Sequence, residues 1–349
     1  MKRSYVSYLM LVLVFLMAVV ASCSKEGPAG PAGKDGVDGE DGINGTDGTA
    51  TCIQCHSDDQ VNFAKTNQWA HSTHATGGNY ERNEGECAIC HTSQGFLGYN
   101  VSGTYDYEAA GAMISNPNPV NCYTCHQIHS TYEVDDYAFT VTAPAMLRNT
   151  GGQTFDFGFG NLCANCHQGR TVDPWPVPGG DDIVVTSSRY GVHHGPQANT
   201  LSGMGLEGFG AASNHPHKNI TNACVTCHMA EPYGVQSGGH TMFMGYEYHG
   251  AVELNVNGCV GCHSDEESLI ANTEELQMEV AELLAELKVL LDATGITAEG
   301  SDSSVPGTYS ADVAAACLNY KAITEDRSLG IHNPTYIKKT LQNSIAALQ

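Results

Sequence analysis

The sequence predicts a mainly α-helical fold with much irregular loop, in which bound groups supply most of the core. Three observations carry this prediction. A Cys-x-x-Cys-His motif occurs six times between residues 52 and 263, the chain has 39 glycines and 8% aromatic residues, and leucines at heptad spacing mark the C-terminal part. Glycine-rich polar stretches are typical of loops, and apolar residues at heptad spacing are typical of helices.

Each of the six motifs has the pattern of a c-type haem attachment site. Two thiols of such a site bond the porphyrin, and the adjacent histidine supplies one axial nitrogen to the iron. Six repeats, each followed at once by histidine, argue against chance and against a simple redox dithiol. The attachment residues are Cys52, Cys55, Cys87, Cys90, Cys122, Cys125, Cys163, Cys166, Cys224, Cys227, Cys259 and Cys262. The proximal histidines are His56, His91, His126, His167, His228 and His263. We therefore predict six covalently bound c-type haems.

The spacing of the motifs leaves roughly 35 residues for each haem, and chains below about 40 residues seldom build a sufficient apolar core. The haems themselves are thus expected to form most of the core of residues 51–263, the predicted hexahaem domain. The formal charge of −23 excludes nucleic acid as an expected partner. Cys317 falls on the apolar side of a predicted helix, where a buried and inert thiol is expected.

The N-terminus predicts export. Lys2 and Arg3 precede an apolar run, and small residues follow before Cys23, so residues 1–22 have the pattern of a signal peptide. The residues before Cys23 resemble a bacterial lipobox, which implies cleavage before Cys23 and a lipid on that residue. An ordinary signal peptide with an incidental cysteine is the alternative. If Cys23 carries a lipid, the protein is expected to be anchored at the bacterial outer membrane, either on the cell surface or on the periplasmic face.

Glycine recurs at every third position from Gly27 to Gly48. This Gly-x-y run, within residues 23–50, is collagen-like. It contains only two prolines, Pro28 and Pro31, so a flexible acidic tether is favoured over a short trimerising stalk. Either one would separate the haem domain from the membrane.

The second axial ligands are expected to be histidines. The chain has 16, and the motifs use six, so the ten that remain exceed the need. Ligation by two histidines occupies both axial positions of the iron. No position is then left for a substrate, which favours electron transfer. His129 lies one helical turn after a proximal histidine, so it could serve only a neighbouring haem. Of His215 and His217, which lie before the fifth motif, one is expected to be a ligand, and His215 is the candidate. The selected candidates are His74, His129, His193, His194, His215, His240 and His332.

Three helices are predicted in residues 264–349. Ser264-Asp265-Glu266-Glu267 predicts a capped start, and Gly295 an end, for a helix from Asp265 to about Thr294. Its heptad stripe predicts packing either on its own haem domain or across a subunit interface in a homo-oligomer. A second helix is expected over 312–326. Asn333 and Pro334 predict the start of a third that runs to about Leu348 and places His332 just before it.

Five short segments carry a resemblance to a known family. They are Trp-x-x-Ser-x-His-Ala around His74, His-His-Gly-Pro-Gln from His193, Asn-Ala-Cys-Val-Thr-Cys-His-Met from Asn222, Gly-Gly-His-Thr around His240 and Gly-Ile-His-Asn-Pro-Thr-Tyr around His332. Over residues 52–349 the chain resembles multihaem cytochromes related to pentahaem nitrite reductase and hydroxylamine-oxidising enzymes. The resemblance implies stacked haems. It also implies distal ligands at His74, at one of His193 and His194, at His240 and at His332.

The resemblance carries no catalytic residue across. Pentahaem nitrite reductases typically have one Cys-x-x-Cys-Lys site, whereas all six motifs here end in histidine. The leading hypothesis is therefore an electron-transfer conduit that passes single electrons to another cytochrome, a membrane redox protein, or an extracellular mineral or metal acceptor. A reductase of nitrite, hydroxylamine or a similar nitrogen species at one five-coordinate haem is the alternative. A third hypothesis is a haem polymer whose subunits exchange histidine ligands.

Overall fold

The computed structural model describes residues 60–132, 134–192, 195–207, 209 and 214–349. These residues all belong to one compact unit. The predictions for the signal peptide, Cys23, the Gly-x-y tether, the first motif (Cys52, Cys55 and His56), His193 and His194 lie outside the described residues.

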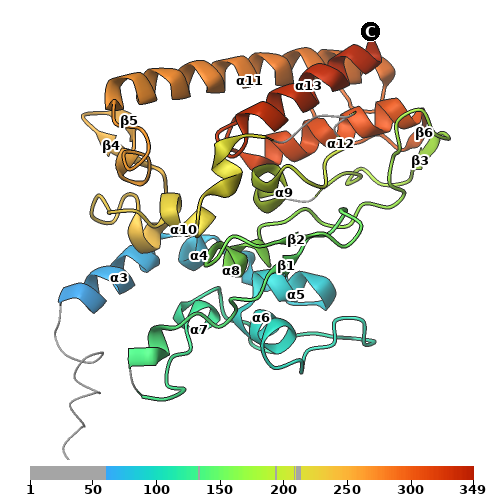
Figure 1. Ribbon diagram of the computed structural model, residues 1–349. Coiled ribbons are helices and arrows are strands. Elements are labelled where there is room, and N and C mark those ends of the chain that lie inside the picture. Colours follow the sequence, from blue (N-terminus) through green and yellow to red (C-terminus); the bar gives the residue numbers. More distant parts are fainter. Residues whose placement is uncertain (1–59, 133, 193–194, 208, 210–213) are drawn as a thin grey trace, which may run out of the picture. The chain divides into compact units, whose positions relative to one another are not determined.

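Helices and loops dominate the described residues (Figure 1), which confirms the predicted fold class. The α-helices are α3 (Gln60–His71), α4 (Thr73–Thr76), α5 (Gly85–His91), α6 (Ser93–Asn100), α7 (Cys122–Cys125), α8 (Gly160–Ala164), α9 (Gln197–Ser202), α10 (Ala223–His228), α11 (Glu266–Thr294), α12 (Ala311–Asp326) and α13 (Pro334–Leu348). Short 3₁₀ helices are η2 (Asn79–Glu81), η3 (Val134–Tyr137), η4 (Pro216–Asn219), η5 (Gly239–Thr241) and η6 (Val256–Gly258).

The strands form three small antiparallel pairs. They are β1 (Ala145–Met146) with β2 (Thr154–Phe155), β3 (Ile183–Val185) with β6 (Gly307–Tyr309), and β4 (Gly245–Tyr248) with β5 (Ala251–Leu254). The β3–β6 pair aligns Ile183 with Tyr309 and so ties the middle of the chain to the C-terminal helices. Two-stranded pairs of this size depend on the packing around them.

The C-terminal helices begin and end where the sequence predicts. Asp265 caps α11 by accepting a hydrogen bond from the Ser268 N–H, and Gly295 ends the helix with a positive φ of 81°. Only Gly readily adopts this conformation after a helix. Asn333 caps α13, whose first residue is Pro334. The ends of a helix leave backbone N–H and C=O groups without partners inside the helix. The capping residues that satisfy these groups therefore determine where each helix begins and ends.

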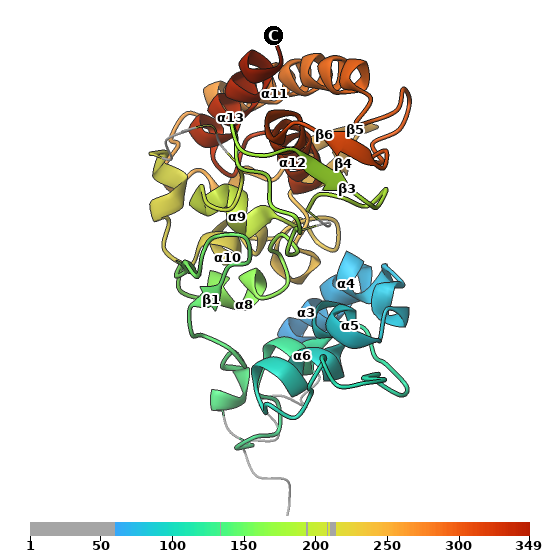
Figure 2. The same cartoon turned by 90° about the vertical axis from the view of Figure 1, so that its right-hand side faces the viewer.

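The three C-terminal helices pack on one another (Figures 1 and 2) and form the main apolar core. Val280, Leu287 and Leu291 of α11 meet Leu318 of α12 and Leu341 of α13, and all five side chains are buried. The heptad stripe of α11 therefore packs on α12 and α13 of its own chain, whereas the prediction named the haem domain of 51–263 or a subunit interface. Cys317 is fully buried in the same core, as predicted.

A second, smaller apolar cluster lies among the haem motifs. It includes Leu147, Phe155, Ala164, Leu201 and Ala223. Within the described part of the chain, no helix is both long and apolar enough to cross a bilayer.

Candidate haem sites

Each described motif forms about one helical turn. Motifs two to five lie on or at α5, α7, α8 and α10, and the sixth follows η6. The His126 N–H donates to the Cys122 carbonyl, and the His167 N–H to the Cys163 carbonyl, both over 2.9 Å. One turn places residues three or four apart on the same side of a helix. Both thiols and the histidine of a motif can therefore contact the same side of one porphyrin.

Four proximal histidines each face a second histidine from elsewhere in the chain. The ring centres are 6.0 Å apart for His74 and His167, 6.3 Å for His126 and His240, 6.3 Å for His228 and His332, and 6.4 Å for His217 and His263. A ligating nitrogen lies about 2 Å from its metal and about 1 Å from its own ring centre, so two imidazoles on opposite sides of one ion are about 6 Å apart. All four separations fit one iron between two imidazoles.

We number these sites by their motifs. Site three contains His126 and His240, site four His167 and His74, site five His228 and His332, and site six His263 and His217. The ring planes cross at 76° in site four and 81° in site six, against 35° in site three and 41° in site five. The paired sites thus form two geometric classes.

Hydrogen bonds to Nδ1 orient the rings. His126 contacts the Tyr137 carbonyl at 2.7 Å, His217 the Ile331 carbonyl at 2.8 Å, and His228 the Met242 carbonyl at 2.9 Å. His167 Nδ1 lies 3.2 Å from Gln197 Oε1, and His332 Nδ1 lies 2.7 Å from Asp326 Oδ1. An acceptor at Nδ1 keeps the proton there and leaves Nε2 as the nitrogen available for a metal.

Burial keeps most of these imidazoles neutral, the form that binds a metal. Burial and the nearby His167 lower the pKa of His74 to about 4, and burial with His126 and Lys65 does the same for His240. The pKa values of His167, His217 and His228 are also lowered, chiefly by burial. Desolvation disfavours the charged imidazolium.

The structure favours His217 over His215 in site six. His217 faces His263 and has a carbonyl at Nδ1, whereas His215 Nδ1 accepts a 3.3 Å hydrogen bond from the His217 N–H as the cap of η4. An Nδ1 that accepts leaves the proton of the neutral ring on Nε2. His217 is therefore the better-placed candidate than the predicted His215, because the turn at Pro216 gives the two rings different hydrogen-bond partners. Ligation by either residue stays a prediction.

The remaining described candidates are placed differently. His129 has a positive φ of 61°, stacks on Tyr132 with ring centres 5.3 Å apart, and lies 3.4 Å from Tyr123 Oη through Nδ1. These contacts do not join it to any of the four described pairs. His91, the predicted proximal histidine of the second motif, is the last residue of α5.

Two glycines let neighbouring motifs approach closely. A Cβ at Gly258 would lie 2.9 Å from Cys227 Cα, and one at Gly160 would lie 3.1 Å from Ala223 Cβ. Gly258 precedes the sixth motif, Gly160 precedes the fourth, and Ala223 precedes the fifth. Side chains at these positions would separate the backbones. Motif five therefore packs against both motif four and motif six.

Cysteine sulfurs of different motifs also lie together. The pKa of Cys166 is raised by its hydrogen bond with Cys90, by burial, and by the nearby thiols of Cys90, Cys125 and Cys163. Cys163 is likewise hydrogen-bonded to Cys224. In a protein that carries haem these thiols are thioethers on porphyrin edges. The thiols of motif four thus lie near thiols of motifs two, three and five.

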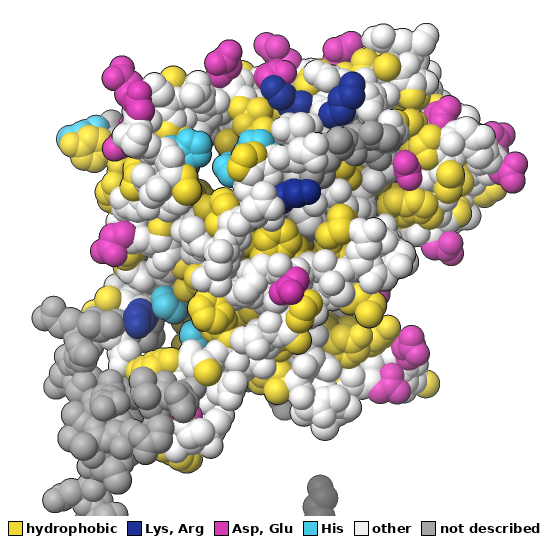
Figure 3. All heavy atoms as spheres, viewed as in Figure 1, with side chains coloured by type: hydrophobic (Ala, Val, Ile, Leu, Met, Phe, Trp, Pro, Cys, Tyr) yellow, Lys and Arg dark blue, Asp and Glu magenta, His cyan; other side chains and the backbone are white. Residues whose placement is uncertain are grey.

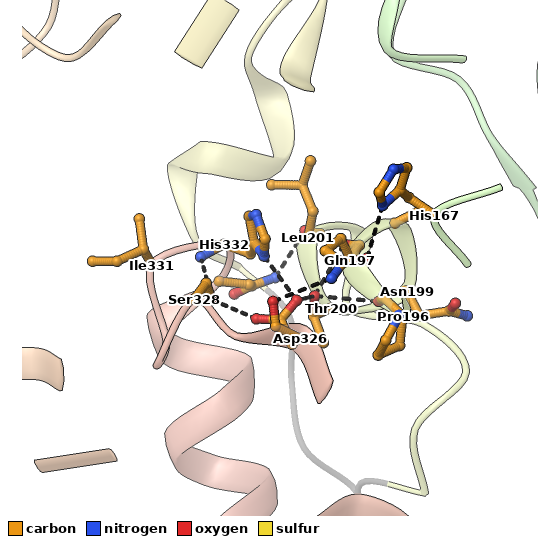
Figure 4. A network of polar contacts seen from close by, with 12 residues as sticks. His167, Pro196, Gln197, Asn199, Thr200, Leu201, Asp326, Ser328, Ile331 and His332 are labelled. Atoms are coloured by element: carbon orange, nitrogen blue, oxygen red, sulfur yellow. Dashed lines mark hydrogen bonds and ion pairs between the residues drawn. The ribbon is translucent and has the colours of Figure 1, made fainter. Parts of the chain in front are cut away.

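A polar network that the sequence did not indicate joins sites four and five (Figure 4). Asp326, whose side chain is fully buried, accepts hydrogen bonds from His332 and from the hydroxyls of Thr200 and Ser328. Burial by itself raises the pKa of Asp326, but His332 and these hydroxyls outweigh it, so the pKa lies below its usual value. Gln197, which contacts His167, also donates to the Asp326 carbonyl. No sequence pattern singles out an aspartate six residues before a ligand.

Histidine side chains border hollows on the face seen in Figure 3, next to hydrophobic side chains, while acidic side chains lie mostly toward the rim. A porphyrin needs both features, because its faces are apolar and its iron needs axial nitrogens. The donor set, the spacing of the histidine pairs and their surroundings fit c-type haem.

The fold is that of a solved multihaem cytochrome. The outer cell wall cytochrome OcwA is 21% identical, with a TM-score of 0.53 over 82% of this chain and 50% of that one. An undecahaem cytochrome from the S-layer of Carboxydothermus ferrireducens is 19% identical, with a TM-score of 0.44 over 80% of this chain and 40% of that one. The chain thus spans half the length of OcwA. No family model and no curated protein matches it. The resemblance to nitrite reductases stays a prediction.

Proposed function

We propose that this chain is a hexahaem c-type cytochrome that conducts single electrons outside the cytoplasm. When bound, each haem supplies one-electron chemistry through its ferric and ferrous iron. The observation that carries the proposal is the set of four histidine pairs at ring separations of 6.0 to 6.4 Å. Two histidines on one iron leave no position for a substrate, so these sites exchange electrons and not ligands.

The contacts between motifs support a continuous path. Gly160 and Gly258 bring motif four against motif five and motif five against motif six, and Cys90 and Cys166 join motifs two and four. The protein's part is to hold the porphyrin edges close and to keep the imidazoles oriented through Nδ1. Site four, beside sites two, three and five, is the proposed junction of the path.

We further propose that the chain is exported and anchored by lipid at Cys23 to the outer membrane, with the Gly-x-y tether between the anchor and the haem domain. The signal-like N-terminus supports export, and OcwA, whose fold the chain shares, is described as an outer cell wall cytochrome. Other cytochromes, membrane redox proteins or an extracellular mineral are the proposed partners. The Cys23→Ser variant should be released from membranes, as measured by fractionation. It should also fail to incorporate labelled palmitate.

Electron paramagnetic resonance of the oxidised protein tests the conduit. We expect only low-spin ferric signals, unchanged when nitrite is added, and a haem content of six per chain. The His217→Ala variant is the positive control, because it opens site six and should give a high-spin signal that responds to nitrite.

A high-spin signal in the unmodified protein that shifts with nitrite would overturn this proposal. It would favour the alternative, a reductase of small nitrogen species at one five-coordinate haem. A haem content below six with low-spin signals would contradict the haem count and leave the conduit standing.

A further inference from the structure

The second axial ligand of site five has a carboxylate as its hydrogen-bond partner. His332 Nδ1 lies 2.7 Å from Asp326 Oδ1. In sites three, four and six the described Nδ1 contacts of His126, His167 and His217 go to neutral oxygens, and so does that of His228, the other ligand of site five. Site five therefore combines two oriented imidazoles with a formal negative charge.

Asp326 is built to remain a charged acceptor. Its side chain is fully buried and receives three hydrogen bonds, from His332, Thr200 and Ser328. Each oxygen of the buried carboxylate thus has a hydrogen-bond donor. The adjacent Arg327 does not neutralise it, because the Arg327 side chain is 76% exposed and pairs with Glu325 at 3.9 Å.

A carboxylate that is hydrogen-bonded to a histidine ligand would change the reduction potential of the iron that the histidine holds. The hydrogen bond draws the Nδ1 proton away and makes Nε2 a stronger donor. The negative charge also acts across a poorly screened interior, where electrostatic effects are large. Both effects favour the ferric iron over the ferrous one, so both lower the reduction potential.

We propose that Asp326 sets the potential of site five: acting through His332, it makes this site the hardest to reduce of the four paired sites. This inference rests on the proposed function, since it needs the haem of site five. Motif five packs against motifs four and six, so electrons that follow these contacts pass through the site of lowest potential among the four. Asp326 is a positioning residue, because it acts through His332 and does not touch the iron.

The test is a redox titration of the purified holoprotein, followed by optical absorbance and by electron paramagnetic resonance. Asp326→Asn keeps the shape and the acceptor but removes the charge. We expect the low-spin signal of site five to disappear at a potential higher by at least about 59 mV, which is a tenfold change in a one-electron equilibrium. In the parent protein this potential is expected to be the lowest among the four paired sites, and it is the lowest potential meant below. The other signals should move much less.

Two further variants make the result decisive. Asp312→Asn removes a carboxylate from the same helix, where it accepts only a backbone hydrogen bond from Gly179, and should leave the lowest potential unchanged. Thr200→Val leaves Asp326 charged with one donor fewer, so its bond to His332 should strengthen and the lowest potential should fall. This variant decides the matter if Asp326→Asn does not fold.

The proposal is overturned if Asp326→Asn retains all haems and the lowest potential stays within a few millivolts of the parent, or if Thr200→Val raises it. These outcomes differ from a failure of the proposed conduit, which would appear as a high-spin signal in the parent protein before any variant is made.

Discussion

Residues 60–144 and residues 264–349 are similar in length but build their interiors differently. The described part of 60–144 buries only three hydrophobic side chains, Ala88, Ile89 and Phe96, whereas 264–349 buries eighteen. The first segment holds two haem motifs and the second holds none. A segment of this size needs a large apolar surface to fold. The contrast indicates that porphyrins supply this surface in the N-terminal part, and that helix packing supplies it in the C-terminal part.

The C-terminal segment 264–349 meets a later part of the haem-motif region at site five. His228 comes from α10 among the motifs, and His332 comes from the turn between α12 and α13. The Ile331 carbonyl of the same turn also orients His217 of site six. The helical core therefore provides a rigid platform for ligands of the haem region, which is how precise metal sites are supported.

The largest effect is expected from removal of one attachment site. The double change Cys163→Ala and Cys166→Ala deletes the covalent bonds of the junction site, so residues 60–263 should lose their compact structure. Limited proteolysis should then cleave this region rapidly, and the haem content should fall by one or more. Cys317→Ala, which removes a thiol from the helical core, is the control and should retain every haem. Intact protection of 60–263 in the double variant would contradict a core made of porphyrins.

A smaller effect is expected from a cavity in the helical core. Leu287→Ala truncates a fully buried side chain of α11 and should lower the free energy of unfolding by about 2–5 kcal/mol, because it removes apolar contacts and leaves a void. Thermal unfolding followed by circular dichroism measures it. Val289→Ala, at a side chain that is 68% exposed on the same helix, should change stability by about 0.5 kcal/mol or less. Equal losses of stability in both variants would show that burial of apolar side chains in this core does not stabilise the helices.

The next comparison separates ligation from packing. His217→Ala should convert site six to high spin, since the iron loses its second imidazole, while stability changes by about 1 kcal/mol or less. His215→Ala should leave the spin state unchanged and only weaken the cap of η4. Electron paramagnetic resonance distinguishes them. A high-spin signal from His215→Ala alone would reverse the assignment of site six.

The smallest effect is expected at a surface ion pair of the helical core. Lys338 Nζ lies 3.0 Å from Glu279 Oε2, with side chains 34% and 43% exposed. Lys338→Met should lower the stability by about 0.2–1 kcal/mol, because exposed pairs are screened by water. High salt should remove most of the difference. A loss that persists in high salt would point to a packing role of the lysine stem.

The sequence by itself determined the attachment chemistry and the helices, because both depend on neighbouring residues. Two cysteines and a histidine within one turn define an attachment site wherever it lies, and Asp265, Gly295, Asn333 and Pro334 act on the helix ends beside them. The structure confirmed the predicted helices within a residue of their bounds. The burial of Cys317 was predicted in the same way, from its place on one helix face.

Only the tertiary structure decided which histidine faces which. Partners such as His74 with His167 or His126 with His240 are far apart in the sequence, and no local pattern encodes their pairing. His215 and His217 are two residues apart, and the sequence does not distinguish them as ligands. In the structure, the ring of His217 lies 6.4 Å from that of His263, whereas Nδ1 of His215 accepts a hydrogen bond from the His217 N–H. Asp326 acquires its role in the same way: its carboxylate becomes a haem-site residue only because the turn after α12 brings His332 back upon it. Attachment motifs and helix caps depend on neighbouring residues and can be predicted from the sequence. Histidine pairs and the contact of Asp326 with His332 form only when packing brings distant segments together.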